Sequence, residues 1–249
     1  PQPLRPLRSC PSKNLSDVPA PDNWAHAGID FCVRTGLMSG VGNGRFDPKG
    51  TTTRAQAVQV LYELSGAPKV SGKTPFTDLT HGWYQSAVLW AYQTGVTSGM
   101  SETTFAPDQE MSRAMLAVIL YARAGQPAVE AANPFTDVPA DSWYTDAVIW
   151  AADNGIVSGF GDGTFRPNDA LTRAQAAVML CAFAAFTQDD VTVRADLSAY
   201  SDAGQIPSWA MDAMQWANAR QLIIGRDSAH LAPAAATTRA EMATILSAY

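Results

Sequence analysis

The stretch Leu171-Thr172-Arg173-Ala174-Gln175 decides the fold, because its core returns three more times at a fixed distance from a tryptophan. The other copies are Thr53-Arg54-Ala55-Gln56, Ser112-Arg113-Ala114-Met115 and Thr238-Arg239-Ala240-Glu241. In every copy the arginine follows a tryptophan by 30 residues, in the pairs Trp24/Arg54, Trp83/Arg113, Trp143/Arg173 and Trp209/Arg239. Self-similarity at a fixed period predicts a repeat protein whose units bury their apolar faces against one another.

The composition of the chain limits the classes of protein to which it can belong. Apolar residues make up 47% of it and charged residues 16%, with a formal net charge of -6. A generally basic nucleic-acid surface is therefore not expected, and an anionic ligand would have to meet locally concentrated arginines. No apolar run reaches the ~18 residues that a membrane-spanning helix needs.

The three cysteines, Cys10, Cys32 and Cys181, are odd in number and show no CxxC spacing. The pattern indicates neither a disulfide framework nor a zinc site, and we expect no metal or cofactor. Cys32 and Cys181 lie among apolar residues and are expected in the core. Because the chain starts at Pro1 and not at methionine, we expect a processed or excised fragment. The lack of a visible signal peptide then does not indicate the cytoplasm.

We expect a proline-rich, basic linker or disordered tail at residues 1–13, followed by four units. The units span residues 14–66, 75–125, 134–186 and 196–249. Each opens with an apolar residue two positions before an aspartate, in the pairs Leu15/Asp17, Phe76/Asp78, Phe135/Asp137 and Tyr200/Asp202. An apolar residue beside an aspartate just ahead of a helix is typical of a docked and capped opening segment.

A tryptophan-led helix follows in each unit, predicted over residues 24–37, 83–96, 143–156 and 209–222. Apolar residues stand five, seven and eight positions after the tryptophan, which fits one buried stripe of an α-helix. Trp90, Trp150 and Trp216 fall on this stripe and are expected in the core. Gly36 and its equivalents Gly95 and Gly155 end the helix, whereas the fourth unit has Gln221 there.

A structured loop leads to the second helix, which begins at the Thr/Ser-Arg-Ala motif. The loop glycines Gly40, Gly99, Gly159 and Gly225 align, and we expect them to adopt a positive φ. Thr53/Gln56, Thr172/Gln175 and Thr238/Glu241 match the capping box, and Ser112 with Met115 retains half of it. The second helix should bury Val60, Ile119, Met179 and Ile245 beside Leu61, Leu120, Leu180 and Leu246.

Capping does not explain the arginine. A cation in the first helical turn faces the positive end of the macrodipole, at a cost of roughly 0.3–1 kcal/mol when exposed. Four such placements in one frame require a compensating partner. An internal carboxylate, such as one of the opening aspartates, and an external anion at the helix N-terminus satisfy this requirement equally well.

These co-linear motifs resemble the S-layer homology repeat of bacterial cell-surface proteins. The third unit matches best, with Pro134-Phe135-Thr136-Asp137-Val138-Pro139, Gly161-Asp162-Gly163-Thr164-Phe165-Arg166-Pro167 and the Leu171–Gln175 stretch. The resemblance covers about residues 14–249. It implies an all-α fold of tandem helix-loop-helix repeats, in which three units form a pseudo-threefold, three-pronged body.

The resemblance also implies a function, the non-covalent anchoring of a surface protein to the bacterial cell wall. In this family, grooves between neighbouring repeats bind secondary cell-wall polysaccharide that often carries ketal-linked pyruvate on N-acetylmannosamine. The ligand-binding residues carried over are Arg54, Arg113, Arg173, Arg239, Asp17, Asp78, Asp137, Asp202, Gly40, Gly99 and Gly159. The partner is then a wall polysaccharide, with peptidoglycan as a further partner, and the location is the cell surface.

The four tryptophans that open the first helices, Trp24, Trp83, Trp143 and Trp209, are expected to be partly exposed and able to stack on sugar. The spacing from one such tryptophan to the next is 59, 60 and then 66 residues. A closed threefold body has no equivalent place for a fourth unit. We therefore expect units one to three to form the ring and the fourth to be appended, with a weakened groove in the second unit.

Two other classes of function remain to be compared with the anchor. A protein–protein scaffold or self-assembly module would use the arginines only to pair with internal aspartates. A wall-active glycosidase needs two carboxylates facing across a cleft. The chain has only five glutamates, no HExxH or GxSxG motif, and scattered histidines, so catalysis by this chain is not expected. It could still be the anchoring part of such an enzyme.

Overall fold

The computed structural model describes residues 11–97 and 99–248 and is all-α, as predicted. The first helix of each unit is α1 (His26–Thr35), α3 (Gln85–Gln93), α5 (Thr145–Asp153) or α7 (Met211–Ala219). The second is α2 (Arg54–Leu64), α4 (Arg113–Arg123), α6 (Arg173–Phe186) or α8 (Arg239–Ala248). Short 3-10 helices η1 (Pro11–Asn14), η2 (Gly82–Tyr84), η3 (Ala203–Gln205) and η4 (Ser208–Ala210) complete the described part, where no β-strand is present.

The first helices begin two residues later than predicted. Trp83 and Trp209 belong to the 3-10 turns η2 and η4, so the regular helix starts only after them. These helices also end two or three residues before the predicted bounds. The predicted stop at glycine is confirmed at Gly36, which has a left-handed φ of 82° directly after α1. Gln221, which lies at the equivalent position after α7, is forced into the same region with φ 58°.

The predicted tail at residues 1–13 lies mostly outside the described residues, which also exclude Cys10. Its last residues belong to η1, so structure begins inside the segment expected to be a tail. Cys32 is buried as predicted, and Cys181 is half-buried. Burial raises the pKa of the Cys32 thiol to about 12. In the described part, no helix is both long and apolar enough to cross a membrane.

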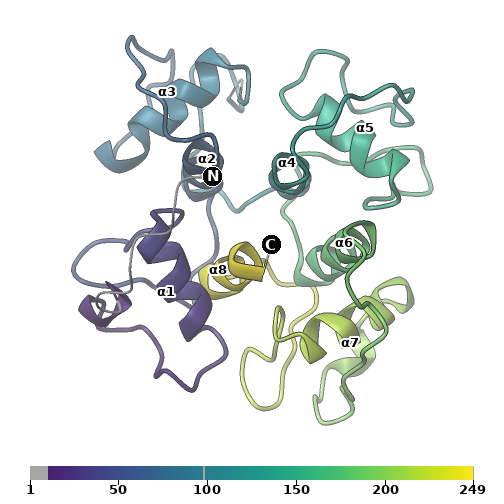
Figure 1. The fold of residues 1–249 in the computed structure, drawn as a ribbon. Helices are drawn as coiled ribbons and strands as arrows, with labels where there is room; N and C mark the ends of the chain where they lie inside the picture. Colours follow the sequence, from purple (N-terminus) through teal and green to yellow (C-terminus); the bar gives the residue numbers. More distant parts are fainter. Residues whose placement is uncertain (1–10, 98, 249) are drawn as a thin grey trace.

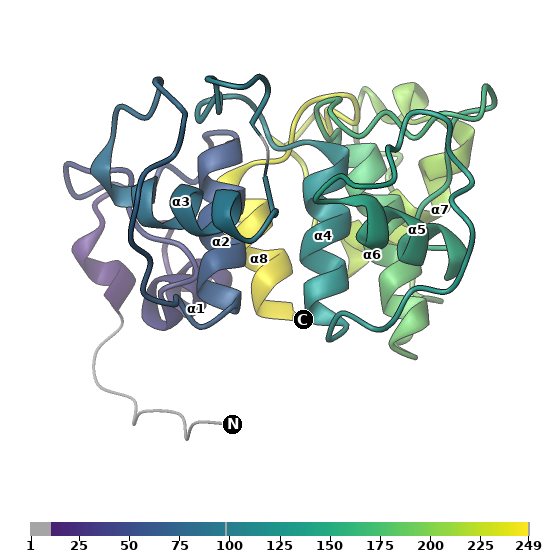
Figure 2. The same cartoon turned by 90° about the horizontal axis from the view of Figure 1, so that it is seen from above.

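Each prong of the molecule combines helices from two neighbouring units. The first helix of one unit packs on the second helix of the preceding unit: α3 on α2, α5 on α4 and α7 on α6. The same rule joins α1 to α8, which connects the first unit to the fourth (Figure 1). The second helices lie on the inside and the first helices on the outside (Figure 1), and the view from above shows α2, α8 and α4 one after another across the middle of the molecule (Figure 2). The result is a closed ring of four prongs.

Backbone hydrogen bonds form an equivalent seam between each unit and the next. The first two N–H groups of α4 donate to Asp169 and Pro167 of the third unit, at 3.0 and 3.1 Å. Those of α8 donate to Gly50 and Pro48 of the first unit, at 2.8 and 3.0 Å. One isolated β-bridge marks each of the four seams: Thr53–Glu110, Ser112–Ala170, Thr172–Ala236 and Thr51–Thr238.

The prediction of a threefold body with an appended fourth unit is therefore wrong. The fourth unit has the same seams on both sides as the others, and it closes the ring onto the first. Its wider spacing comes from α6, which has 14 residues where α2 and α4 have 11, and from a slightly longer segment between α6 and the next tryptophan. The backbone seams of the fourth unit form despite these extra residues.

The core follows the predicted columns. The paired apolar residues of the second helices are buried, from Val60 and Leu61 in α2 to Ile245 and Leu246 in α8. Trp90, Trp150 and Trp216 are also buried, which confirms their assignment to the core. The capping boxes form as predicted in α2 and α6, and Ser112 caps α4 with its half of the device.

Candidate functional site

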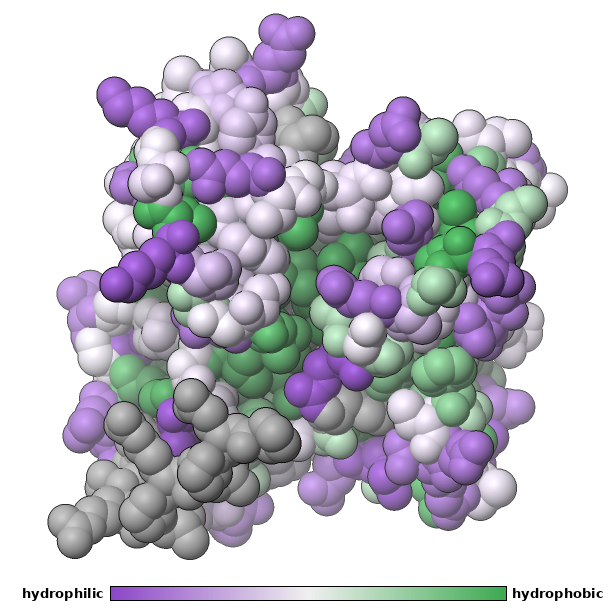
Figure 3. Space-filling view, turned by 45° about the horizontal axis from the view of Figure 1, so that its top comes forward, coloured by the Kyte–Doolittle hydropathy of each residue, from purple (hydrophilic) through white to green (hydrophobic). Residues whose placement is uncertain are grey.

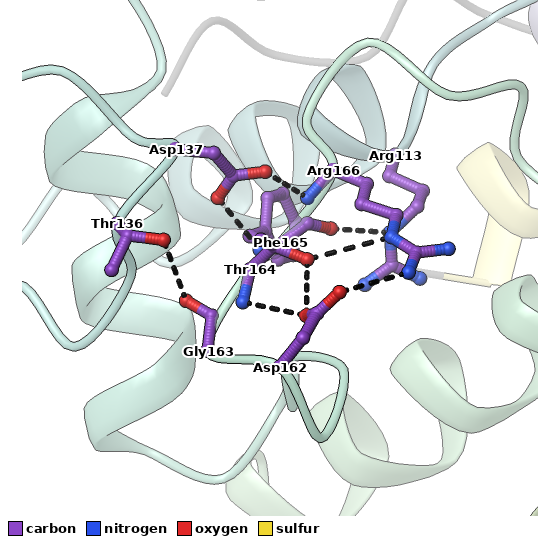
Figure 4. A network of polar contacts seen from close by, with 8 residues as sticks. All are labelled: Arg113, Thr136, Asp137, Asp162, Gly163, Thr164, Phe165 and Arg166. Carbon is purple, nitrogen blue, oxygen red and sulfur yellow. Dashed lines mark hydrogen bonds and ion pairs between the residues drawn. The ribbon is translucent and has the colours of Figure 1, made fainter.

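The opening aspartates hold the loops of their own units. The two carboxylate oxygens of Asp137 accept the backbone N–H groups of Phe165 and Arg166, both at 2.7 Å (Figure 4). Asp17, Asp78 and Asp202 make the same pair of contacts 27 to 30 residues along the chain. The sequence had suggested that these aspartates cap the following helix, and that prediction is wrong. Each aspartate instead fixes the Phe-x-Pro loop of its own unit, to which an arginine of the preceding unit donates.

This contact supports a strained backbone position in each loop. The second N–H donor is a residue other than glycine with a positive φ: 57° at Asp47, Ala106 and Arg166, and 49° at Ala232. Burial raises the pKa of Asp202, but the N–H groups of Leu231 and Ala232 outweigh this and hold its pKa below the usual value. The carboxylate therefore stays ionised and keeps both acceptors available.

The loop glycines create space for a close approach. A Cβ at Gly159 would lie 2.5 Å from the ring of Phe135 and 2.6 Å from the carbonyl oxygen of Thr164. A Cβ at Gly40 would lie 2.8 Å from the carbonyl oxygen of Arg45. Only Gly99 has the predicted positive φ, of 81°, so that prediction is wrong for the other three. Their glycines let the loop close over the apolar opening residue.

The motif arginines reach across the seams to backbone carbonyl oxygens. Each Nε–H donates to the Phe-x-Pro loop of the next unit: Arg54 to Phe105, Arg113 to Phe165, Arg173 to Leu231 and Arg239 to Phe46, at 2.7 to 3.0 Å. Nη2 of Arg113 donates to Ser158 at 3.3 Å, and Nη2 of Arg239 to Ser39 at 2.6 Å. The guanidinium carbon of Arg113 also lies 4.7 Å from the Phe165 ring centre. At Arg54, Arg113 and Arg239, carbonyl oxygens and an aromatic face thus compensate the charge, an arrangement that neither sequence alternative included.

These guanidinium groups are buried charges. The four arginines are between 1% and 6% exposed. Burial lowers the pKa of Arg54, Arg173 and Arg239 to about 10 and also lowers the pKa of Arg113. All four remain protonated at neutral pH, so each guanidinium carries its positive charge in surroundings that screen it poorly.

The helix N-termini do not provide the unpaired N–H groups that the sequence had suggested. The N–H groups of Arg113 and Ala114 donate across the seam, and that of Met115 donates to the Ser112 hydroxyl. The remaining positive feature of each seam is the arginine head group itself.

Among the residues that the structure describes, we name three grooves at the seams A, B and C, with volumes of about 240, 400 and 360 Å³. Each combines an arginine from one unit, a glycine loop and second helix from the next, and a tryptophan from the unit after that. Groove A contains Arg239, Gly40, Gln56 and Trp83; groove B contains Arg113, Gly159, Gln175 and Trp209; groove C contains Arg173, Gly225, Glu241 and Trp24. Apolar side chains gather in the recesses between the lobes, whereas polar side chains cover the lobes (Figure 3).

The structure brings most of the predicted arginines and tryptophans into these grooves. Trp83 in groove A is 49% exposed and Trp24 in groove C is half-buried. Arg54, Gly99 and Trp143 hold the equivalent positions at the remaining seam and line none of the three grooves. The opening aspartates line none of them either, so their predicted contact with sugar has no support from this geometry.

Trp209, one of the four tryptophans expected to be partly exposed, is 59% exposed in groove B. Sequence reasoning missed one kind of groove residue. Gln56, Gln175 and Glu241 line grooves A, B and C, although their capping role alone had seemed to account for them.

One motif arginine is paired with a carboxylate. Arg173 forms an ion pair with Glu241, and these side chains are 1% and 2% exposed. Within residues 11–97 and 99–248, the other three motif arginines form no ion pair. The internal partner proposed from the sequence therefore exists at one seam, and it is a glutamate of the next unit, not an opening aspartate.

The Asp162 loop beside groove B uses its carboxylate internally. Asp162 accepts hydrogen bonds from the backbone and hydroxyl of Thr164 and pairs with Arg166 at 3.1 Å (Figure 4). In the part of the chain that the structure describes, no three His, Cys, Asp or Glu side chains gather as metal ligands would.

Comparison with known proteins identifies the repeats. The model of the S-layer homology domain matches residues 14–58, 75–115, 134–177 and 199–243, which is most of the chain. The chain belongs to the S-layer homology family. It is 33% identical over 170 residues to the surface-layer 125 kDa protein of Lysinibacillus sphaericus, covering 67% of the chain and 14% of that protein.

Enzymes also carry similar segments. The chain is 29% identical over 178 residues to an endoglucanase of Bacillus sp. (strain KSM-635), covering 71% of the chain and 19% of the enzyme. A further relative is not an enzyme: the chain is 28% identical over 169 residues to S-layer protein EA1 of Bacillus anthracis, covering 66% of the chain and 19% of that protein. The chain thus spans less than a fifth of the length of these relatives.

The family sets the general function. S-layer homology domains anchor surface proteins to the cell wall and are themselves non-catalytic. The described fold consists of such units, and the protein is located at the cell surface. S-layer homology domains bind wall polymers, so the grooves at the seams are the candidate sites for contact with such a polymer.

Proposed function

We propose that the chain anchors a surface protein by binding an acidic secondary cell-wall polysaccharide in the grooves at its seams. The acidic group is a ketal-linked pyruvate on an N-acetylmannosamine residue. The observation that carries the proposal is the combination, in grooves A and B, of a buried guanidinium with an exposed indole.

The chemistry of each groove suits a sugar with a carboxylate. The arginine attracts the carboxylate through a charge-assisted hydrogen bond that is strong where water is excluded. The indole offers a flat apolar face to the C–H groups of a pyranose ring. In groove B, Gln175 adds an amide that can donate to a sugar hydroxyl and also accept from one.

The scaffold alternative has less support. It requires the motif arginines to be consumed by internal aspartates, and within the described residues none of them pairs with an aspartate. The similarity to an endoglucanase favours a role for such units as the anchoring part of wall-active enzymes.

A pull-down with purified wall sacculi tests the proposal. The chain should sediment with intact sacculi and stay in solution with sacculi from which hydrofluoric acid has stripped the attached polysaccharide. Unchanged binding to the stripped peptidoglycan would reject the polysaccharide as the partner.

A competition experiment tests the acidic group itself. The methyl glycoside of N-acetylmannosamine with ketal-linked pyruvate should release the bound chain, and the same glycoside without pyruvate should not. Equal release by both sugars would show that the carboxylate contributes nothing.

A further inference from the structure

The fourth unit differs from the first and third at the third residue of its inner helix. Glu241 in α8 stands where α2 has Gln56 and α6 has Gln175. These side chains serve the same capping function: Glu241 accepts the Thr238 N–H at 2.8 Å and Gln175 accepts the Thr172 N–H at 3.1 Å. A neutral amide therefore caps the helix as well as a carboxylate does. Capping therefore does not explain why the fourth unit has a carboxylate at this position of its inner helix.

The charge changes the state of the arginine in groove C. There Arg173 is paired with Glu241, and neither side chain is open to water. Groove B is lined by Arg113 and Gln175, and in the described part of the chain the guanidinium of Arg113 donates to the carbonyl oxygens of Phe165 and Ser158. Carbonyl oxygens accept hydrogen bonds but leave the unit charge of Arg113 in place. Groove B thus keeps the positive charge of Arg113, whereas in groove C the charge of Arg173 is cancelled by Glu241.

We infer that Glu241 is a built-in carboxylate that occupies, in groove C, the place an acidic sugar takes in grooves A and B. The residue at this position, glutamine or glutamate, then decides which grooves bind the acidic polymer. This inference rests on the proposed function. It goes beyond that function because it makes the grooves unequal and names the residue responsible.

Two further cations line groove C and have to be considered. Arg226 stands where groove B has Phe160, and Lys49 is the other cation that lines groove C. Both are exposed, and Arg226 donates to the carbonyl oxygen of Ala236. Charges exposed to water attract an anion only weakly. To bind Arg173, the carboxylate of a ligand would still have to displace Glu241. The displaced Glu241 would then be a buried charge without a partner, which is strongly unfavourable.

Reciprocal substitutions exchange the two states. Glu241→Gln should open groove C, and Gln175→Glu should close groove B by pairing with Arg113. Both side chains keep the carbonyl oxygen that the capping box needs. The protein already contains an unpaired arginine in one groove and a paired arginine in another, so each variant reproduces an arrangement that the fold accommodates elsewhere.

The probe is the methyl glycoside of N-acetylmannosamine with ketal-linked pyruvate. Calorimetry counts its sites on the full chain, and the indole N–H signals of Trp24 and Trp209 report on grooves C and B separately. Tryptophan-to-phenylalanine variants assign these signals. Glu130→Gln and Gln205→Glu serve as charge controls, because they make the same changes at exposed positions that line none of the three grooves.

Glu241→Gln is expected to add one site and to make the Trp24 indole respond to the probe. Gln175→Glu is expected to remove one site, with binding at groove B weakened about 100-fold and the Trp209 signal unmoved. The charge controls should match the wild-type chain. The same number of sites in the wild type and both variants would overturn the inference and leave the proposed function standing. A wild-type chain that does not bind the probe would overturn the proposed function and the inference with it.

Discussion

The seam between the fourth and first units uses the same contacts as the seam between the second and third. Arg113 donates its backbone N–H to Asp169 at 3.0 Å, and Arg239 donates its own to Gly50 at 2.8 Å. The Nε–H bonds of these arginines differ in sequence separation, 52 residues at the internal seam and 193 at the closing one. For a flexible chain this longer separation costs only about 1 kcal/mol more. Ring closure is therefore governed by local contacts and not by chain connectivity.

The two seams differ in how closely their helices approach. At the closing seam Gly28 of α1 faces α8, and a Cβ there would lie 2.8 Å from the Thr244 Cα. The equivalent residue of α5 at the internal seam is Ala147, which is buried with its methyl group in place. The closing seam is thus built for a tighter contact, which indicates that the fourth unit is a full member of the ring.

Deletion of residues 188–249 should have the largest effect on this comparison. It removes α8 and with it the burial of Met242, Ile245 and Leu246, worth about 1.5–3 kcal/mol for each side chain. That sum approaches the ~5–15 kcal/mol of a whole domain, so the shortened chain should lose its cooperative thermal transition in circular dichroism. A three-unit chain that melts at the wild-type temperature would support the alternative in which three units form the folded body and the fourth is only appended.

Arginine replacement should weaken both seams alike. Arg239→Gln and Arg113→Gln each leave buried carbonyl oxygens without their donor, which should lower the free energy of unfolding by about 2 kcal/mol. Urea denaturation measures both variants side by side. A cost at Arg113 without a comparable cost at Arg239 would mean that the fourth unit contributes little to closure.

Gly28→Ala should be destabilising even though alanine favours helices. Overpacking against the backbone of α8 should cost about 1–3 kcal/mol, which exceeds the ~1 kcal/mol gained in helix propensity. Ala147→Gly is the matched change at the internal seam and should also destabilise the protein, there by lost burial and propensity. A more stable Gly28→Ala protein in urea unfolding would contradict the tight closing contact.

The smallest expected effect concerns Gln221, a strained residue of the fourth unit that is not part of the seam contacts. Gln221 has a φ of 58° where the other units place glycine. Gln221→Gly should stabilise the protein by about 0.5–1 kcal/mol, because relief of the left-handed strain slightly exceeds the added chain entropy. Differential scanning calorimetry would register a small rise in melting temperature. The same or a lower melting temperature would contradict the prediction that the backbone at Gln221 is strained.

Much of the fold could be predicted from the sequence because the signals are local. Caps, apolar columns and helix ends follow from residues within a few positions of one another, as at Thr172 and Gln175. The size of the ring could not be predicted in this way. Nothing near Arg239 indicates that its side chain donates to Phe46, 193 residues away.

The candidate site was predicted in part for a similar reason. The arginine frame identified the charges, and the tryptophan frame identified the exposed indoles of Trp83 and Trp209. The role of the opening aspartates depends on a loop 27 to 30 residues later, and the pairing of Arg173 with Glu241 crosses a seam. Both depend on how distant segments meet, which the spacing of motifs does not reveal.

The most direct test of the account follows the Trp83 indole N–H signal while the pyruvylated glycoside is titrated into the wild-type chain and into Arg239→Gln. Groove A combines Trp83 of the second unit with Arg239 of the fourth, so it exists only if the ring is closed. The account predicts that Trp83 responds in the wild type and no longer responds in Arg239→Gln, while Trp209 in groove B responds in both. A Trp83 response that persists in Arg239→Gln would contradict it.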